Sequence, residues 1–218
     1  MKFNPLIISL KNLIPKPLAE LGSLQSSVWL SELSFQPQTY YQLHAPSGKG
    51  KSTLIHILYG LRKDYSGEVL FDNQPISTML FSDWTTLRQQ SLSIVFQDLR
   101  LFPNLTALEN IQLKASLYPE NQSIHIQECA ELLGIAHLLN HPAETLSYGE
   151  RQRVAIIRAL VQPFQWLLLD EPFSHLDSKN IEIASQLIEK EVNKKKAGII
   201  LTSLGFDYPL PIHQKLTL

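Results

Sequence analysis

The sequence predicts an α/β domain with a mainly parallel sheet, and three observations point to this class. Short apolar runs alternate with segments of helical periodicity along most of the chain. One run, 166–169, is apolar throughout, which is typical of a strand buried on both faces. A strand, a glycine-containing loop and a helix follow one another directly over 40–61. With 218 residues, 44% of them apolar, the chain can build a substantial core as one large domain or two interleaved subdomains.

The individual elements follow from the same patterns. Strands are predicted at 40–44, 68–71, 93–96, 166–169 and 198–202, with an edge strand at 214–218, and helices at 52–61, 152–161 and 181–192. We expect turns at Ser66-Gly67 and Asp72-Asn73, on either side of the second strand. Between 98 and 147 helical periodicity dominates and prolines interrupt it. This stretch is therefore predicted to be a helical insertion into the sheet domain.

The composition excludes several classes of protein. The formal net charge is −1, so no overall basic field attracts nucleic acid or anionic lipid, and the run Lys194-Lys195-Lys196 is interpreted as a solvated helix end. The single cysteine, Cys129, excludes an internal disulfide and is predicted to be a buried structural thiol. No apolar run reaches the roughly 18 residues that span a bilayer, and 1–10 lack the features of a signal peptide. We expect a cytosolic protein that meets a membrane only through a partner.

The first chemical signal is the segment 45–53, APSGKGKST, between a predicted strand and a predicted helix. Successive N–H groups in such a loop form a nest for phosphate oxygens, and the helix N-terminus adds its positive dipole end. Lys51 is expected to neutralise the β- and γ-phosphates, and the Ser52 hydroxyl to hold Mg²⁺. Ala45 departs from the pattern, which has glycine first, and alanine tolerates a positive φ poorly. The predicted nucleotide-binding residues here are Ser47, Gly48, Lys49, Gly50, Lys51, Ser52 and Thr53.

The second signal is the pair Asp170 and Glu171 at the end of the buried strand 166–169. In parallel sheets this is the edge where ligands bind. Asp170 is expected to reach Mg²⁺ through a water, and Glu171 to orient and polarise the water that attacks the γ-phosphate. The alternative interpretation is that the two acids are simply solvated at the end of the strand. The phosphate loop upstream in the sequence favours the catalytic interpretation over this one.

The segment 146–154, LSYGERQRV, distinguishes among the classes of phosphate-loop protein. It resembles the signature of ATP-binding-cassette (ABC) ATPases, usually written LSGGQ, with Tyr148 and Glu150 in place of a glycine and the glutamine. The resemblance implies that Ser147 and Gly149 offer a hydroxyl and N–H groups to the γ-phosphate of ATP held by the opposite subunit, and that Glu150 is a nucleotide-binding residue beside them. Ser147 followed by Glu150 is also a capping box, and both interpretations can hold together.

Other marks of the same family occur in the expected order, so the resemblance covers about 28–204. Gln97 looks like the family's Q-loop glutamine, which contacts Mg²⁺ and the attacking water. The segment 174–177 looks like the D-loop, which crosses the dimer interface, and Asp177 is implied to be one of the nucleotide-binding residues. The segment 99–109 resembles the region that receives a membrane partner. Several stretches are most similar to the lipoprotein-release, macrolide-efflux and cell-division ABC ATPases.

The resemblance implies a P-loop NTPase with a RecA-like core, a helical subdomain and a small N-terminal antiparallel β region. The core is expected at 1–97 and 154–218, and the helical subdomain with the signature at 98–153. ATP and Mg²⁺ are the implied cofactors. The implied partners are a second copy or a homologous ATPase in a head-to-tail dimer, and transmembrane permease subunits, with no nucleic acid. The protein would then lie on the cytoplasmic face of the inner membrane.

Two family features are altered. Ser203 occupies the place of the switch histidine, and its hydroxyl is expected to donate to the γ-phosphate, although it is shorter and cannot carry charge. His213 and His175 are the nearest histidines, and structural roles are expected for both. The segment 12–27 contains no aromatic residue to stack on adenine, which leaves Trp29 either as that residue or as core. We therefore expect ATP binding and dimerisation with hydrolysis slower than in a standard member.

Three functions remain open at this point. The chain is a transport motor, an ABC module that uses ATP as a regulatory switch with little turnover, or a soluble phosphate-loop enzyme such as a nucleotide kinase. The signature argues against the kinase, which has no use for a phosphate site supplied by a second subunit.

Overall fold

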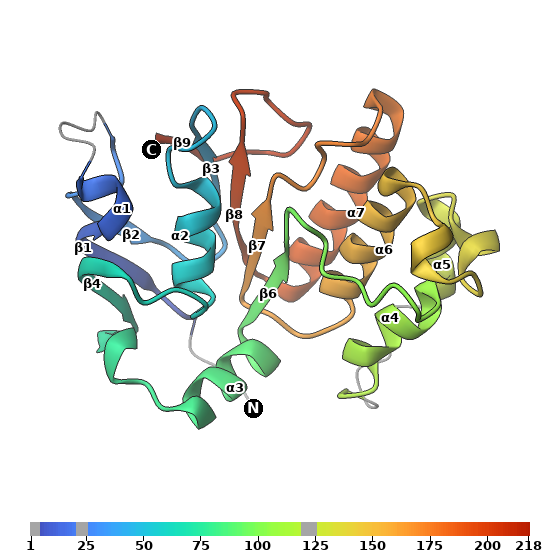
Figure 1. The fold of residues 1–218 in the computed structure, drawn as a ribbon, viewed down its shortest axis with the longest axis horizontal. Coiled ribbons are helices and arrows are strands. Elements are labelled where there is room, and N and C mark those ends of the chain that lie inside the picture. The colour runs from blue at the N-terminus through green and yellow to red at the C-terminus, as the bar shows by residue number, and fades with distance from the viewer. Residues whose placement is uncertain (1–4, 21–25, 119–125) are drawn as a thin grey trace.

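The computed structural model describes residues 5–20, 26–118 and 126–218, and a five-stranded sheet forms its centre (Figure 1). The strand order is β6-β7-β8-β3-β9, and every pairing in this sheet is parallel. The predicted mainly parallel sheet is therefore confirmed. Its strands are β3 (Tyr40–His44), β6 (Leu92–Val95), β7 (Trp166–Asp170), β8 (Gly198–Ser203) and β9 (Gln214–Thr217).

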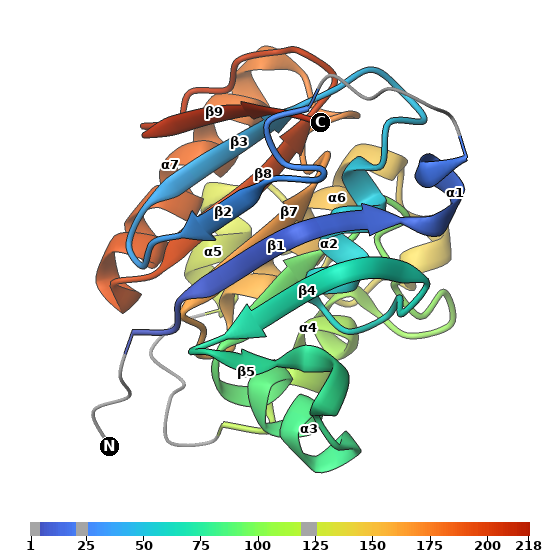
Figure 2. The same cartoon turned by 90° about the vertical axis from the view of Figure 1, so that its left-hand side faces the viewer.

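A smaller antiparallel sheet lies in front of the parallel one in the view of Figure 2. This sheet has the order β2-β1-β4-β5 and confirms the expected N-terminal antiparallel region. Helix α2 packs between the two sheets, where its apolar side chains join residues of β1, β3, β7 and β8 in one core. The strands are β1 (Ile8–Pro15), β2 (Glu32–Phe35), β4 (Tyr65–Phe71) and β5 (Gln74–Pro75).

The other face of the parallel sheet is covered by α6 and α7, with α4 and α5 beyond them (Figure 1). The run 166–169 of strand β7 is apolar throughout because both faces of the strand are buried. Leu167 and Leu169 belong to the core under α6 and α7, whereas Trp166 and Leu168 belong to the core around α2. The helices are α1 (Lys16–Ala19), α2 (Lys51–Leu58), α3 (Phe81–Gln90), α4 (Ala107–Ala115), α5 (Ile126–Leu132), α6 (Tyr148–Leu160) and α7 (Ser178–Lys195).

The region between β6 and α6 is helical, as expected of the insertion, and contains α4, α5 and 3₁₀ turns at Ala136–Leu138 and Ala143–Thr145. Helix α6 continues across position 153, so the division at 97/98 and 153/154 stays a prediction. Cys129 is buried in this region, and burial raises the pKa of its thiol to about 11, as expected of a structural cysteine. Within the described ranges, no helix combines the length and apolar character that crossing a bilayer requires.

Of the two turns predicted around β4, one is confirmed and one is wrong. Asp72 and Asn73 both have positive φ, +48° and +69°, as the tight connection from β4 to β5 requires. Ser66 and Gly67 instead lie inside β4, where the pairing with β1 shifts register. Gly67 has φ +84°, and a Cβ there would lie 2.2 Å from the Asn12 carbonyl oxygen. The glycine therefore serves a β-bulge with close backbone approach.

Candidate functional site

The phosphate loop leaves β3 at His44 and enters α2 at Lys51. Gly48 and Gly50 have positive φ values of +79° and +93°. A residue without a Cβ adopts this conformation at little cost, which explains the two glycines. A Cβ at Gly50 would also lie 2.7 Å from the Leu18 side chain. Ala45 is buried and is not among the residues of positive φ, so the first position of the loop does not need glycine here. The strain expected at Ala45 is absent.

Lys51 is the buried cation of the site. Its Nζ donates to the carbonyl oxygens of Ala45, at 2.8 Å, and Pro46, at 3.1 Å. The same Nζ lies 3.3 Å from Glu171 Oε1, and both side chains are less than a tenth exposed. The loop and the end of β7 are thus joined by a buried ion pair, although the two residues are 120 positions apart in sequence (171 − 51).

Gln97 and Ser52 extend this pair into a chain of four side chains. Gln97 Nε2 lies 3.3 Å from Glu171 Oε2, and the Ser52 hydroxyl donates to Gln97 Oε1 at 3.2 Å. Three predicted segments, the loop, the end of β6 and the end of β7, therefore meet at the carboxyl edge of the sheet. This is the edge at which parallel α/β sheets bind ligands.

Asp170 lies beside this chain and is fully buried. Its Oδ1 accepts a hydrogen bond from Thr202 Oγ1 at 2.8 Å, whereas Oδ2 is buried without a hydrogen-bond partner. No group of three or more His, Cys, Asp or Glu side chains in the described part of the chain forms a closed metal cage. The Ser52 hydroxyl, the Gln97 amide oxygen and the free Asp170 oxygen instead suit Mg²⁺, which binds through few carboxylates and keeps its waters and substrate phosphates.

Two buried polar residues that the sequence analysis missed hold Glu171 in place. Thr202 Oγ1 accepts a hydrogen bond from Glu171 N at 3.0 Å. Gln152 Nε2 donates to the Glu171 carbonyl at 3.4 Å, while its Oε1 accepts from His175 N at 3.2 Å. This support matters because Glu171 has φ +48°, an uncommon conformation for a non-glycine residue. The available signal was a glutamine on the face of α6 that is otherwise apolar and buried.

The signature segment forms the N-terminus of α6. Ser147 is its N-cap, and Glu150 Oε2 accepts from both the N–H and the hydroxyl of Ser147 at 2.8 Å. The capping box is therefore confirmed, and hydrogen bonds from Ser147 are the main cause that lowers the pKa of Glu150. A Cβ at Gly149 would lie 2.9 Å from the His175 carbonyl oxygen, which explains the glycine.

Tyr148 and Asp177 have roles of their own in this region. The Tyr148 hydroxyl donates to the Gln97 carbonyl oxygen at 2.8 Å, so the residue that replaces a signature glycine ties α6 to the end of β6. Asp177 is exposed and caps α7 by accepting from Asn180 N at 2.8 Å. Its contact with a second subunit stays a prediction.

Ser203 is fully buried, and its hydroxyl is engaged by neighbours on β3. It lies 3.0 Å from His44 Nδ1 and accepts from Gln42 Nε2 at 3.1 Å. The hydroxyl is therefore engaged within the sheet, and its donation to the γ-phosphate stays a prediction. The sequence analysis missed His44, whose Nε2 lies 3.8 Å from Asp207 Oδ1. Burial is the main cause that lowers the pKa of the His44 imidazole.

Trp29 and His213 are structural. Trp29 is 3% exposed, and its Nε1 donates to the Lys49 carbonyl oxygen at 3.3 Å. The ring thus packs against the phosphate loop and has no free face for adenine. His213 Nδ1 accepts from Tyr40 N at 2.8 Å, as expected of a residue beside the edge strand.

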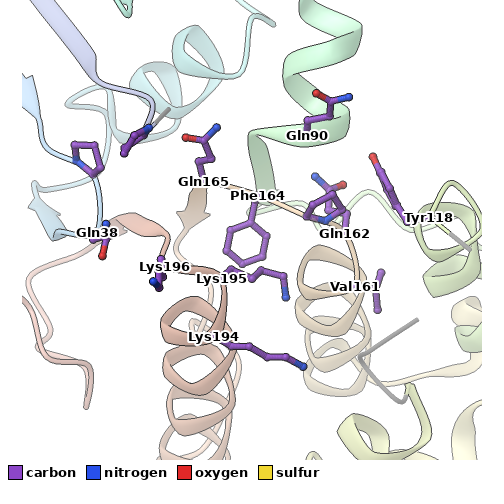
Figure 3. Close-up of a pocket in the computed structure, with 13 residues that line it drawn as sticks. Gln38, Gln90, Tyr118, Val161, Gln162, Phe164, Gln165, Lys194, Lys195 and Lys196 are labelled. Atoms are coloured by element: carbon purple, nitrogen blue, oxygen red, sulfur yellow. The ribbon is translucent and has the colours of Figure 1, made fainter. Parts of the chain in front are cut away.

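A cavity of about 310 Å³ opens beside the phosphate loop. Predicted residues line it at one end, and β1 and α1 border the other. A larger hollow of about 640 Å³ lies near the opposite edge of the sheet, where β7 begins and α7 ends (Figure 3). None of the predicted site residues lines that hollow, and its lysines, Lys194, Lys195 and Lys196, close the C-terminus of α7 as predicted. The first cavity is therefore the candidate site.

Comparisons with known proteins identify the family and the fold. A family model described as ABC transporter matches residues 30–174. The dimeric structure of MJ0796, described as a bacterial ABC transporter cassette, is 30% identical with a TM-score of 0.74, covering 89% of this chain and 87% of that one. A post-hydrolysis dimer of MJ0796 bound to ADP and Pi is 29% identical, with the same TM-score and coverage. A bacterial Atm1-family ABC exporter with ATP bound is 24% identical, with a TM-score of 0.73 over 93% of this chain and 35% of that one, and shows the fold alone.

Proposed function

Because this chain belongs to the ABC transporter family of ATP-binding cassettes, we propose that it hydrolyses Mg²⁺-bound ATP beside the phosphate loop to drive a separate membrane protein. The observation that carries the proposal is the chain of Lys51, Glu171, Gln97 and Ser52 at the carboxyl edge of the sheet. It brings a buried cation, a carboxylate, an amide and a hydroxyl to one end of a cavity built on a phosphate loop. The direct test is phosphate release from ATP by the purified chain, with the Glu171 variant described in the Discussion.

Each of these groups has a chemical role. The loop N–H groups and Lys51 bind the phosphates, and the γ-phosphate lies at the Lys51 end. Glu171 and Gln97 hold the attacking water in line, and Glu171 polarises it. Ser52, Gln97 and, through water, Asp170 would hold Mg²⁺, which neutralises charge that develops on the phosphate oxygens. Nucleotide entry must separate Lys51 from Glu171, which frees the carboxylate for the water.

A second copy of the chain, or a homologous ATPase, completes the site. Ser147 is exposed at the positive end of α6, where a phosphate of the partner's nucleotide can bind. Gly149, Glu150 and Asp177 belong to the same surface of the proposed dimer. The two MJ0796 structures are dimers, which supports this arrangement. Binding of the partner's nucleotide must break the hydrogen bond from the Ser147 hydroxyl to Glu150, because the Glu150 carboxylate repels a nearby phosphate.

A groove of about 230 Å³ between α4, α6 and the end of β6 suits a transmembrane partner. Phe102, Leu113 and Leu117 are 57%, 44% and 52% exposed at this groove. Lys114 and Arg158 also line it, and neither forms an ion pair with any described residue. We expect the partner to insert an apolar helix that carries a carboxylate, which would hold this chain on the membrane surface.

Phe102→Asp is expected to abolish co-purification of the tagged chain with a polytopic membrane protein, because it places a charge in the apolar part of the groove. ATP turnover by the isolated chain should be unchanged. The matched control is Phe81→Asp on α3, since Phe81 is 85% exposed and lies outside the groove. Equal recovery of the membrane protein with both variants would contradict the assignment of the groove.

We also propose that hydrolysis is slower than in a standard member, because the Ser203 hydroxyl is engaged by β3. The double variant Ser203→His with His44→Ser makes room for an imidazole at position 203. It should raise the turnover rate, up to the factor of about 10²–10³ that one preorganised donor supplies. Unchanged turnover relative to His44→Ser alone would contradict the proposal. Absence of turnover even in the membrane complex would favour the regulatory alternative.

A further inference from the structure

The outer end of the nucleotide cavity has an unusual lining. Glu171 and Gln97, which contact each other, line it together with Pro15, Pro17 and Arg62. Since Lys51 and Glu171 mark the γ-phosphate end, the nucleoside must extend toward Pro17 and Arg62. No aromatic side chain lines the cavity among the described residues, and 12–27 contain none in the sequence.

Arg62 is held at this end by two neighbours. Its Nη1 donates to Thr53 Oγ1 at 3.2 Å, which brings the guanidinium to the first turn of α2. Its Nε donates to Asp64 Oδ1 at 2.8 Å, and Nη2 contacts the other carboxylate oxygen. Asp64 is fixed in turn, because its carbonyl oxygen accepts from Lys16 N at 3.0 Å.

These hydrogen bonds all engage the edge of the guanidinium. They fix its plane, and the side chain remains 33% exposed. A planar, delocalised guanidinium stacks well on an aromatic ring. Pro15, Pro17 and Leu18 add apolar surface beside it.

We propose that Arg62 is the base-binding residue of this site and that its guanidinium stacks on the purine of the bound nucleotide. The inference rests on the proposed ATP site and extends it. Stacking recognises the π-face that all bases share and reads no hydrogen-bonding edge. The site should therefore bind ATP and GTP with similar affinity.

The test is calorimetric titration of the full chain with ATP, GTP and inorganic tripolyphosphate. Arg62→Ala should weaken the binding of ATP and of GTP by about tenfold each, which is typical of the loss of one stacking contact, and should leave the binding of tripolyphosphate unchanged. Arg62→Lys should lose the same factor, because lysine keeps the charge and the pairing with Asp64 but has no plane. Lys63→Ala, at an exposed neighbouring cation, controls for the loss of charge and should bind all three ligands normally.

Three outcomes would overturn the proposal. Equal ATP affinity in Arg62→Ala and the parent chain would show that Arg62 does not contact the bound nucleotide. Parent-like ATP binding by Arg62→Lys would show that Arg62 acts through its charge. Weaker tripolyphosphate binding by Arg62→Ala would show that Arg62 contacts the phosphates instead of the base. Arg62→Lys keeps the test open if Arg62→Ala folds poorly. Failure of the parent chain to bind tripolyphosphate or ATP would instead reject the nucleotide site itself.

Discussion

Glu171→Gln is expected to lower the rate of ATP hydrolysis by about 10²–10⁴-fold, the factor that a positioned general base supplies. The amide keeps the shape of the side chain and its place beside Gln97, but it cannot polarise a water as the carboxylate does. Binding of ATP should persist, since Lys51 and the loop N–H groups are untouched. Phosphate release at saturating ATP measures the first effect and calorimetry the second.

The same variant tests the proposed dimer. With hydrolysis blocked, ATP should remain between two copies and shift the chain to dimer on size-exclusion chromatography with light scattering. Glu182→Gln, at an exposed carboxylate on α7, is the matched control and should hydrolyse normally. Parent-like turnover by Glu171→Gln would reject both the role of this carboxylate and the assignment of the site.

Lys51→Met is expected to destabilise the fold as well as abolish ATP binding. It leaves the Glu171 carboxylate, 9% exposed, without its cation, and breaking a buried pair from one side typically costs about 3–5 kcal/mol. For a chain of this size, each kcal/mol shifts the melting temperature by about 2–4 °C. Thermal unfolding without nucleotide should therefore show a drop of about 6–20 °C.

The double variant Lys51→Met with Glu171→Gln separates the ion pair from other losses. Removing both charges eliminates the unpaired carboxylate, so most of the lost stability should return although ATP binding does not. Glu171→Gln alone should cost less, because Lys51 keeps the carbonyl oxygens of Ala45 and Pro46 as acceptors. If the double variant melts no higher than Lys51→Met, the buried pair does not account for the effect.

Local patterns were sufficient for most of the fold and much of the site. The apolar run at 166–169 predicted a buried strand because side chains alternate between two faces, and both faces of β7 are covered. The phosphate loop, its helix and the acids after β7 were found because each depends on residues only a few positions apart. The cap at Ser147 and Glu150 is equally local, and it forms as the spacing predicted.

What the sequence could not determine depends on which strands and loops become neighbours. The Ser203 hydroxyl contacts His44 because β8 pairs with β3 in a register that puts these residues opposite each other. Tyr148 reaches Gln97, and Pro15 and Pro17 border the same cavity as the phosphate loop, only because distant segments pack together. By itself the sequence determined the elements, the phosphate loop and the family resemblance, since hydrophobic period and short spacing encode them locally. Tertiary packing alone decided the direction of these polar side chains, because a hydrogen bond needs a partner within about 3 Å, whatever the distance along the chain.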